Sequence, residues 1–188
     1  MVNLVKDVVP AGSWGSLAQP GFAGAGLVVR PWQPGDEGFL LSAYADPDIR
    51  RWHAMTLSDR AEATAWIETA GLRWAQEQGA NWAVTEDGQL LGRIGFRMLD
   101  LAGGEAEVAY WVAPQARGRR VATRALGALI GWARSQGLHR LTLMHSTLNL
   151  ASCKVAQHCG FRDEGTSLRS VLHEDGWHDM HHHALLLE

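Results

Sequence analysis

The sequence predicts a single α/β domain of the α+β kind, in which helices flank a mixed, mostly antiparallel β-sheet. Its 188 residues fit one ordinary domain, and 46% hydrophobic against 20% charged residues provide enough apolar material for a core. Two hairpin signals, at Asp87-Gly88 and at residues 174–176, predict antiparallel strand pairs. An amphipathic stretch over residues 119–137 predicts a helix that packs on the sheet.

The first 26 residues are expected to form an N-terminal arm in front of a domain over residues 27–188. Residues 10–26 hold five glycines, two prolines and two serines, a composition that offers little periodic apolar surface. Trp14 and Phe22 could fix this arm to the domain or to a second subunit, which leaves a homodimer open. A mobile extension is the alternative interpretation.

The domain is expected to open with a strand and a short helix. Residues 27–32 read as a strand, and the turn at residues 34–36 can cap a helix over residues 39–45. Residues 46–55 are interpreted as irregular.

The next segment predicts a helix and three strands. Asp87-Gly88 suits the tight turn between strands over residues 81–87 and 89–99, and a further strand over residues 105–113 ends at Pro114. The helix before them runs from Ser58 to Gly79, because apolar residues recur in it at helical spacing: Ala63, Trp66, Ile67, Ala70 and Trp74.

The second half of the domain predicts two helices and a terminal hairpin. Val121, Ala125, Leu129 and Trp132 form one apolar stripe on the helix over residues 119–137, for which Gly137 suits a C-terminal cap. A strand over residues 138–147 follows. Asn149 then caps a short helix over residues 151–159, Gly160 ends it, and a hairpin turning at Glu174, Asp175 and Gly176 runs to the C-terminus.

The charge balance excludes several classes of partner. Seventeen Lys and Arg residues against 20 Asp and Glu residues give a net charge of −3, which argues against binding to nucleic acid or anionic lipid over the whole surface. No apolar run approaches the roughly 20 residues of a membrane helix, and no signal peptide or anchor is evident. Cys153 and Cys159 lie six apart on one predicted helix, a poor disulfide spacing, so we expect a cytoplasmic protein.

An anion site is expected where the helix of residues 119–137 begins. The free backbone N–H groups of a helix start and the helix dipole both favour negative charge. Four arginines within eight residues add cationic side chains, although a solvated basic helix face is the alternative. These arginines are Arg117, Arg119, Arg120 and Arg124.

This stretch resembles the acetyl-CoA signature of the GNAT superfamily of N-acetyltransferases, Q/R-x-x-G-x-G/A, with Arg120 in place of the central glycine. The segment NLASCKVAQHCGF resembles a second family segment through Asn149, Ser152, Gly160 and Phe161. RPWQPGD and DPDIRRW resemble the branch that acetylates the N-terminal amines of ribosomal proteins, and the resemblance covers roughly residues 27–188.

The resemblance implies a fold and a cofactor site. It implies a sheet splayed between the strands of residues 105–113 and 138–147, where acetyl-CoA inserts as co-substrate. Backbone N–H groups at Trp111 and Val112 would bind pantetheine and polarise the thioester. The remaining CoA-binding residues that it implies are Arg117, Gly118, Arg119, Arg120, Val121, Ala122, Thr123 and Asn149.

Acetyl transfer also needs groups that move protons. Many relatives carry a tyrosine acid seven residues after the asparagine, but Ala156 stands at that position here. Ser152 is the replacement candidate, with a helix-start serine bonded to backbone as the alternative. Glu107 is the candidate base because an apolar strand has little reason to carry an acid, and Glu105 is interpreted as an edge carboxylate.

Nine histidines raise the question of a metal site. Strand alternation sends His181 and His183 to one face and His182 to the other, and the cysteines share no ligand-like spacing with them, so no metal is expected. Trp52, His53 and His145 are the candidate substrate-binding residues, and Trp111 is also expected near the pocket.

The predicted function is acetyl-CoA-dependent N-acetylation of a primary amine, either a protein N-terminus or a small molecule. Two alternatives remain at this point: a CoA-binding sensor or structural module without catalysis, suggested by Arg120 and Ala156, and a His-rich metal protein.

Overall fold

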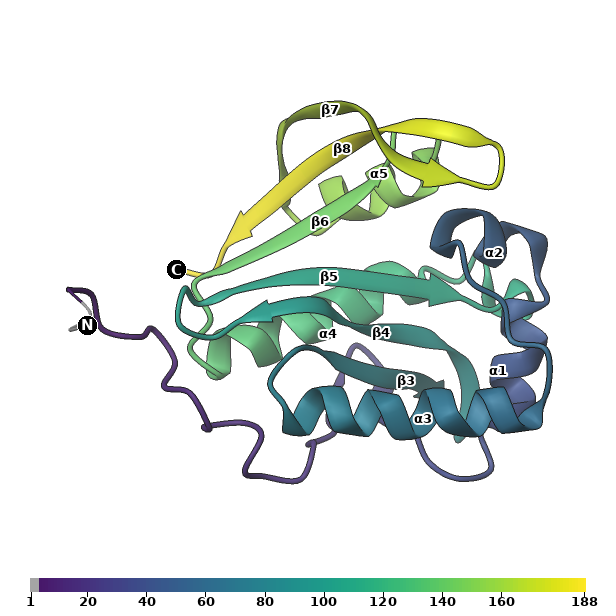
Figure 1. Ribbon diagram of the computed structural model, residues 1–188, viewed down its shortest axis with the longest axis horizontal. Helices are drawn as coiled ribbons and strands as arrows, with labels where there is room; N and C mark the ends of the chain where they lie inside the picture. Colours follow the sequence, from purple (N-terminus) through teal and green to yellow (C-terminus); the bar gives the residue numbers. More distant parts are fainter. Residues whose placement is uncertain (1–3) are drawn as a thin grey trace.

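The structure, a computed structural model that describes residues 4–188, is built around one eight-stranded sheet (Figure 1). The strand order is β1-β2-β3-β4-β5-β6-β8-β7. All neighbours are antiparallel except β5 and β6, which confirms the predicted mixed, mostly antiparallel sheet. The strands are β1 (Phe22–Gly24), β2 (Leu27–Pro31), β3 (Ala80–Glu86), β4 (Gln89–Asp100), β5 (Glu105–Val112), β6 (Arg140–Ser146), β7 (Arg162–His173) and β8 (Gly176–Leu186).

Helices lie on both faces of this sheet. In Figure 1, α3 runs alongside β3 in front of the sheet, and α4 lies behind β4 and β5. None of the helices in the described chain is long and apolar enough to cross a membrane. The helices are α1 (Glu37–Tyr44), α2 (Pro47–His53), α3 (Arg60–Ala75), the 3-10 turn η1 (Pro114–Ala116), α4 (Val121–Ser135) and α5 (Leu150–His158).

The boundaries of most elements agree with the sequence prediction. Asp59 and Asn149 cap α3 and α5 through their side chains, as expected from their residue types. Asp87 and Gly88 both have positive φ, at 49° and 79°, in the turn between β3 and β4. Gly137, at φ 82°, follows α4.

The prediction of an irregular segment over residues 46–55 is wrong, because residues 47–53 form α2. The Asp46 side chain accepts a hydrogen bond from the N–H of Ile49, and Pro47 stands at the first helical position, where its missing N–H costs nothing. Two further boundaries were also wrong: α3 ends at Ala75 before Gly79, and β7 begins at Arg162, ahead of the expected hairpin.

The segment before Leu27 packs on the domain. Its residues 22–24 form β1, which pairs with β2. Trp14 is buried and stacks on Trp74 with ring centroids 5.5 Å apart, while Phe22 stacks on Trp132 at 5.5 Å. Of the two interpretations of the arm, the one in which Trp14 and Phe22 fix it to the domain is therefore the one seen.

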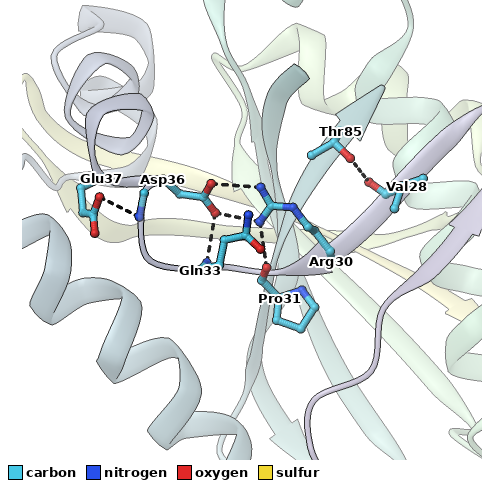
Figure 2. Close-up of polar contacts among 8 residues, drawn as sticks. Val28, Arg30, Pro31, Gln33, Asp36, Glu37 and Thr85 are labelled. Atoms are coloured by element: carbon cyan, nitrogen blue, oxygen red, sulfur yellow. Dashed lines mark hydrogen bonds and ion pairs between the residues drawn. The ribbon is translucent and has the colours of Figure 1, made fainter. Parts of the chain in front are cut away.

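The turn between β2 and α1 is held by buried carboxylates (Figure 2). Asp36 pairs with Arg30 at 2.7 Å and accepts a hydrogen bond from the N–H of Gln33 at 3.0 Å. Glu37 accepts from the N–H of Gly35 at 3.0 Å. The expected turn thus precedes α1, but Asp36 secures the loop before the helix and makes no side-chain cap to it.

Candidate active site

The sheet splays between β5 and β6. These strands pair only from Glu105 to Glu107 against Arg140 to Thr142, and beyond Thr142 they diverge toward the end where α2 lies (Figure 1). Leu143 to Ser146 of β6 pair with β8 only, so the edge of β6 that faces β5 has no strand beside it there. This is the splay that the resemblance implied.

A cavity of about 560 Å³ occupies the splay. Residues of β4, β5, β6, α2, α3 and α5 are among those that line it, so elements that are far apart in the sequence contribute to one site. Among the lining residues that the structure describes, three are arginines and one is a carboxylate, and these are Arg73, Arg93, Arg97 and Glu107. The cavity is therefore cationic.

Glu107 stands on β5 at the last residue that pairs with β6. Its side chain is 14% exposed, lines the cavity and pairs with the guanidinium of Arg97. Glu105, in contrast, is 46% exposed and lies 3.8 Å from Arg140, outside the cavity lining. The structure thus separates the two acids as the sequence analysis did.

Tyr110 and Ser152 form a hydroxyl pair in the same cavity. The Tyr110 Oη lies 2.8 Å from the Ser152 Oγ, and both residues line the cavity. Burial raises the pKa of Tyr110, so its hydroxyl stays protonated across the physiological range. The N–H of Ser152 donates to the Asn149 side chain at 3.0 Å.

Tyr110 lines the cavity but was not predicted from the sequence as a candidate site residue. Ala156, at the position of the usual tyrosine, is fully buried, and the phenol comes instead from β5 across the splay. The available signal was small: Tyr110 is one of two tyrosines in the chain and lies three residues after Glu107 on the same strand. Only the divergence of β5 from β6 brings it to α5.

The candidate substrate-binding residues Trp52, His53 and His145 all line the cavity. Burial and the nearby Arg93 cation lower the pKa of His53 to about 3, so His53 is a neutral imidazole at physiological pH. Burial also lowers the pKa of His145, whose Nδ1 lies 2.8 Å from the carbonyl oxygen of Ser146.

The expectation that Trp111 lies near the pocket is wrong. Trp111 is 4% exposed and packs in a core cluster with Trp32 and Tyr44, and its Nε1 donates to the hydroxyl of Tyr44 at 3.3 Å. The N–H of Ala113 donates to the carbonyl oxygen of Leu91 next to β4. Because the N–H groups of successive residues in a strand point to opposite sides, the N–H of Trp111 also points to β4 and that of Val112 points to the splay. Only Val112 of the two can offer its amide there.

The histidines of β8 alternate as expected, since His182 contacts Ser167 at 2.8 Å while His181 and His183 face His145. The expectation that the cysteines are unrelated to them is wrong for Cys153. One ligand atom from each of four residues lies within 4.8 Å of the other three, and these residues are His145, Cys153, His181 and His183.

The start of α4 presents a run of free backbone amides. The structure gives no acceptor within residues 4–188 for the N–H groups of residues 118–123, whereas Arg124 N–H bonds back to the carbonyl of Arg120. Gly118 and Arg120 both adopt positive φ, at 78° and 56°. Arg120 thus occupies a backbone conformation that suits glycine, the residue usual at this place in the signature.

Three of the four arginine side chains around this start, those of Arg117, Arg119 and Arg124, are paired with carboxylates. Arg117 contacts Asp46 at 2.5 Å and Asp48 at 3.0 Å, which ties α2 to the loop before α4. Arg119 and Arg124 both pair with Glu86, the latter at 2.6 Å. An anion that binds to the amides would meet arginines whose charge is already partly balanced.

The comparisons with known proteins agree with this geometry. Residues 26–162 match the model of the acetyltransferase (GNAT) domain family. YdaF of Bacillus subtilis, named as a candidate ribosomal N-acetyltransferase, is 31% identical over 116 residues, which are 61% of this chain and 63% of that protein.

Two solved structures share the fold. RimL, a ribosomal L7/L12 alpha-N-protein acetyltransferase in complex with coenzyme A, superposes with a TM-score of 0.80 at 17% identity over 89% of this chain and 98% of that one. The microcin C7 self-immunity acetyltransferase MccE, in complex with acetyl-CoA and AMP, superposes with a TM-score of 0.78 at 18% identity. The match covers 86% of this chain and 93% of that one.

The resemblance to the ribosomal-protein branch is confirmed by these similarities. Because the family model spans most of the chain and the splayed sheet carries its site, the protein belongs to the GNAT family of acetyltransferases.

Proposed function

We propose that the protein transfers the acetyl group of acetyl-CoA to a primary amine held in the splay cavity. The observation that carries this proposal is that a carboxylate and a hydroxyl pair line the same cavity, Glu107 on one side and Tyr110 with Ser152 on the other. Acetyl-CoA supplies an activated thioester, and the chain must deprotonate the amine and receive the leaving thiolate.

Glu107 is the proposed base. An acceptor amine arrives as an ammonium ion and becomes nucleophilic only after it loses a proton, which Glu107 can take directly or through water. His53 is a poor alternative because its low pKa makes it a weak base. Arg97 pairs with the Glu107 carboxylate at the cavity wall.

Tyr110 and Ser152 are the proposed acid side. The Tyr110 hydroxyl keeps its proton, and the 2.8 Å contact with Ser152 allows one hydroxyl to donate to the other. A thiolate near this pair would accept a hydrogen bond from the free O–H, which stabilises its charge as the carbon–sulfur bond breaks. The pair then replaces the single tyrosine of many relatives.

The amides of residues 118–123 are the proposed site for the CoA pyrophosphate. Unpaired N–H groups at a helix start and the dipole of α4 favour an anion. The other residues proposed to contact the cofactor are Val112, Arg117 and Asn149, of which Val112 faces the splay with its amide.

The acceptor is proposed to be an amine that carries a carboxylate close to its amino group. Three guanidinium groups against one carboxylate in the cavity wall favour an acceptor with negative charge. Arg93 is the best placed, since its Nε donates to the Asn81 side chain at 2.7 Å and its position is therefore fixed. A peptide N-terminus followed by an acidic residue fits this description, as does a free amino acid.

The experiment compares matched acceptors that differ in one charge. Peptides with Asp or Asn at the second position, and an amino acid against its amide, are offered to the enzyme with acetyl-CoA while thiol release is followed. We expect kcat/KM at least tenfold higher for the anionic member of each pair, and a preference that falls as salt rises. Equal rates for both members would overturn the assignment of the acceptor, and the transfer itself would stand.

A catalytically inactive CoA-binding module is the second candidate, favoured by the left-handed Arg120 in the signature loop. Such a module would bind acetyl-CoA without releasing thiol. A reducing compartment such as the cytoplasm is proposed for the protein, because both cysteines are free thiols.

A further inference from the structure

Four side chains with strong metal-ligand character meet beside the splay cavity, where β6, β8 and α5 come together. His145 lies directly opposite His181 in the β6–β8 pairing, and His183 follows on the same face of β8. Cys153 reaches them from α5. Three imidazoles and one thiol therefore converge from three elements, β6, β8 and α5.

The donor atoms are close enough for a single ion. One ligand atom from each residue lies within 4.8 Å of the other three, and the Nε2 atoms of His145 and His183 are 3.1 Å apart. Around a tetrahedral Zn²⁺ with bonds of about 2.0–2.3 Å, neighbouring ligand atoms are separated by roughly 3.3–3.6 Å. Small side-chain rotations would complete the tetrahedron.

The hydrogen bonds leave unused lone pairs at this point. His145 Nδ1 donates to the carbonyl oxygen of Ser146, so its Nε2 carries a lone pair directed at His183. His183 must then donate from Nε2, and its own Nδ1 is left buried with no partner within residues 4–188. The Nδ1 of His181 is buried without a partner in the same way.

A buried nitrogen atom without a hydrogen-bond partner lowers the free energy of unfolding, so a cluster of such atoms needs an explanation. His145 and His183 are 5% and 2% exposed, so water does not replace the missing bonds freely. A backbone carbonyl that fixes one imidazole nitrogen while the other stays free is also the arrangement that orients histidine ligands in metal proteins.

We propose that His145, Cys153, His181 and His183 form a binding site for one divalent transition-metal ion of the Zn²⁺ class. A set of three imidazoles and one thiolate matches the preference of Zn²⁺ for nitrogen and sulfur in tetrahedral geometry. On binding, the Cys153 thiol loses its proton to solvent, each neutral imidazole gives one lone pair to the ion and keeps its proton on the other ring nitrogen, and four coordinate bonds replace the single imidazole contact.

The site borders the splay cavity, because His145 belongs to the cluster and also lines the cavity. No metal is needed by the residues proposed for acetyl transfer, and the ion would join α5 to β6 and β8. Its expected consequence is a more stable native state, because an ion that binds the folded chain alone stabilises it.

The test uses tag-free full-length protein, stripped with a chelator and titrated with Co²⁺ as a spectroscopic substitute for Zn²⁺. We expect one ion per chain, the visible absorption of tetrahedral Co²⁺, and a thiolate charge-transfer band. Cys153→Ser removes that band, and His181→Asn weakens binding at least tenfold. Zn²⁺ displaces Co²⁺ and raises the melting temperature of the wild type.

Matched controls come from the same elements. His182→Ala, on the other face of β8, and Cys159→Ser, at the C-terminal cap of the helix that carries Cys153, bind Co²⁺ like the wild type. Melting curves of the metal-free variants establish that each one folds. No stoichiometric binding to wild type, or binding that survives Cys153→Ser and His181→Asn but is lost in His182→Ala, would overturn the proposal.

Discussion

The hydroxyl oxygens of Tyr110 and Ser152 lie 2.8 Å apart across the splay, although 42 residues separate them in the chain. Tyr110 comes from the strand that leaves the parallel pairing, and Ser152 from the first turn of α5. This relationship places a protonated phenol where the family's usual tyrosine is absent, and it makes the acid side of the proposed reaction a pair of residues.

The pair predicts non-additive mutants. Tyr110→Phe and Ser152→Ala are each expected to lower kcat on the order of tenfold, because a thiolate of pKa near 8.5 can leave without full protonation. The double variant should be little worse than either single one, since both changes break the same hydrogen bond. Steady-state kinetics at saturating acetyl-CoA measures this. Multiplied losses, or a change confined to the KM of acetyl-CoA, would contradict a shared role.

Glu107→Gln is expected to lower the rate about 10²–10⁴-fold while it keeps the shape of the side chain. The pH profile of kcat/KM gives a second readout, since raising the pH supplies more neutral amine and should partly restore the rate. Glu105→Gln is the matched control, two residues away on the same strand but paired with Arg140 outside the cavity. If the two variants were equally active, Glu107 would not be the base.

Substitutions of Arg120 test whether the backbone amides of the signature loop or the Arg120 side chain binds the cofactor. The free energy of unfolding of Arg120→Gly should exceed that of Arg120→Ala by about 1 kcal/mol, because glycine adopts the φ of 56° without strain. Both variants should bind acetyl-CoA within about threefold of the wild type, as the amides remain. Calorimetry measures the affinity, and a loss above tenfold in both variants would place the binding on the guanidinium instead.

The N-terminal arm is expected to loosen at low pH through Glu77. Partial burial raises the pKa of this carboxyl, but the N–H groups of Gly15, Gly12 and Trp14 that bond to it outweigh burial and lower the pKa below 4.5. A lowered folded-state pKa means that the contribution to stability is complete above pH 4.5 and is lost as the pH falls through the folded-state value. Chemical denaturation between pH 3 and 7 should therefore show a flatter pH dependence for Glu77→Gln. An unchanged slope would mean that Glu77 does not anchor the arm.

Most of the fold could be predicted from the sequence because the signals for its helices and turns are local. The Asp87-Gly88 turn, the caps at Asp59 and Asn149 and the stripe of α4 each depend on residues close in the chain. The helix α2 was missed although Asp46 and Pro47 are a good start signal, because seven residues offer almost no periodicity.

The site was harder to predict because it depends on contacts across the splay. Glu107 and Ser152 were candidates from residue type and resemblance, and both line the cavity, whereas Tyr110 reaches Ser152 only because β5 departs from β6. Strand alternation on β8 was right for the histidines, but alternation within one strand says nothing of Cys153 on α5 or His145 on β6. Trp111 was misplaced because its burial depends on Tyr44 and α1, far away in sequence.

The most direct test of the account is single-turnover transfer from labelled acetyl-CoA, with thiol release and acetylated amine measured together. The account predicts one acetyl amide formed for each thiol released, a wild-type rate well above that of Glu107→Gln, and full activity after treatment with a chelator. Saturable binding of acetyl-CoA without release of thiol, in the presence of anionic and neutral primary amines alike, would contradict it and leave a CoA-binding module.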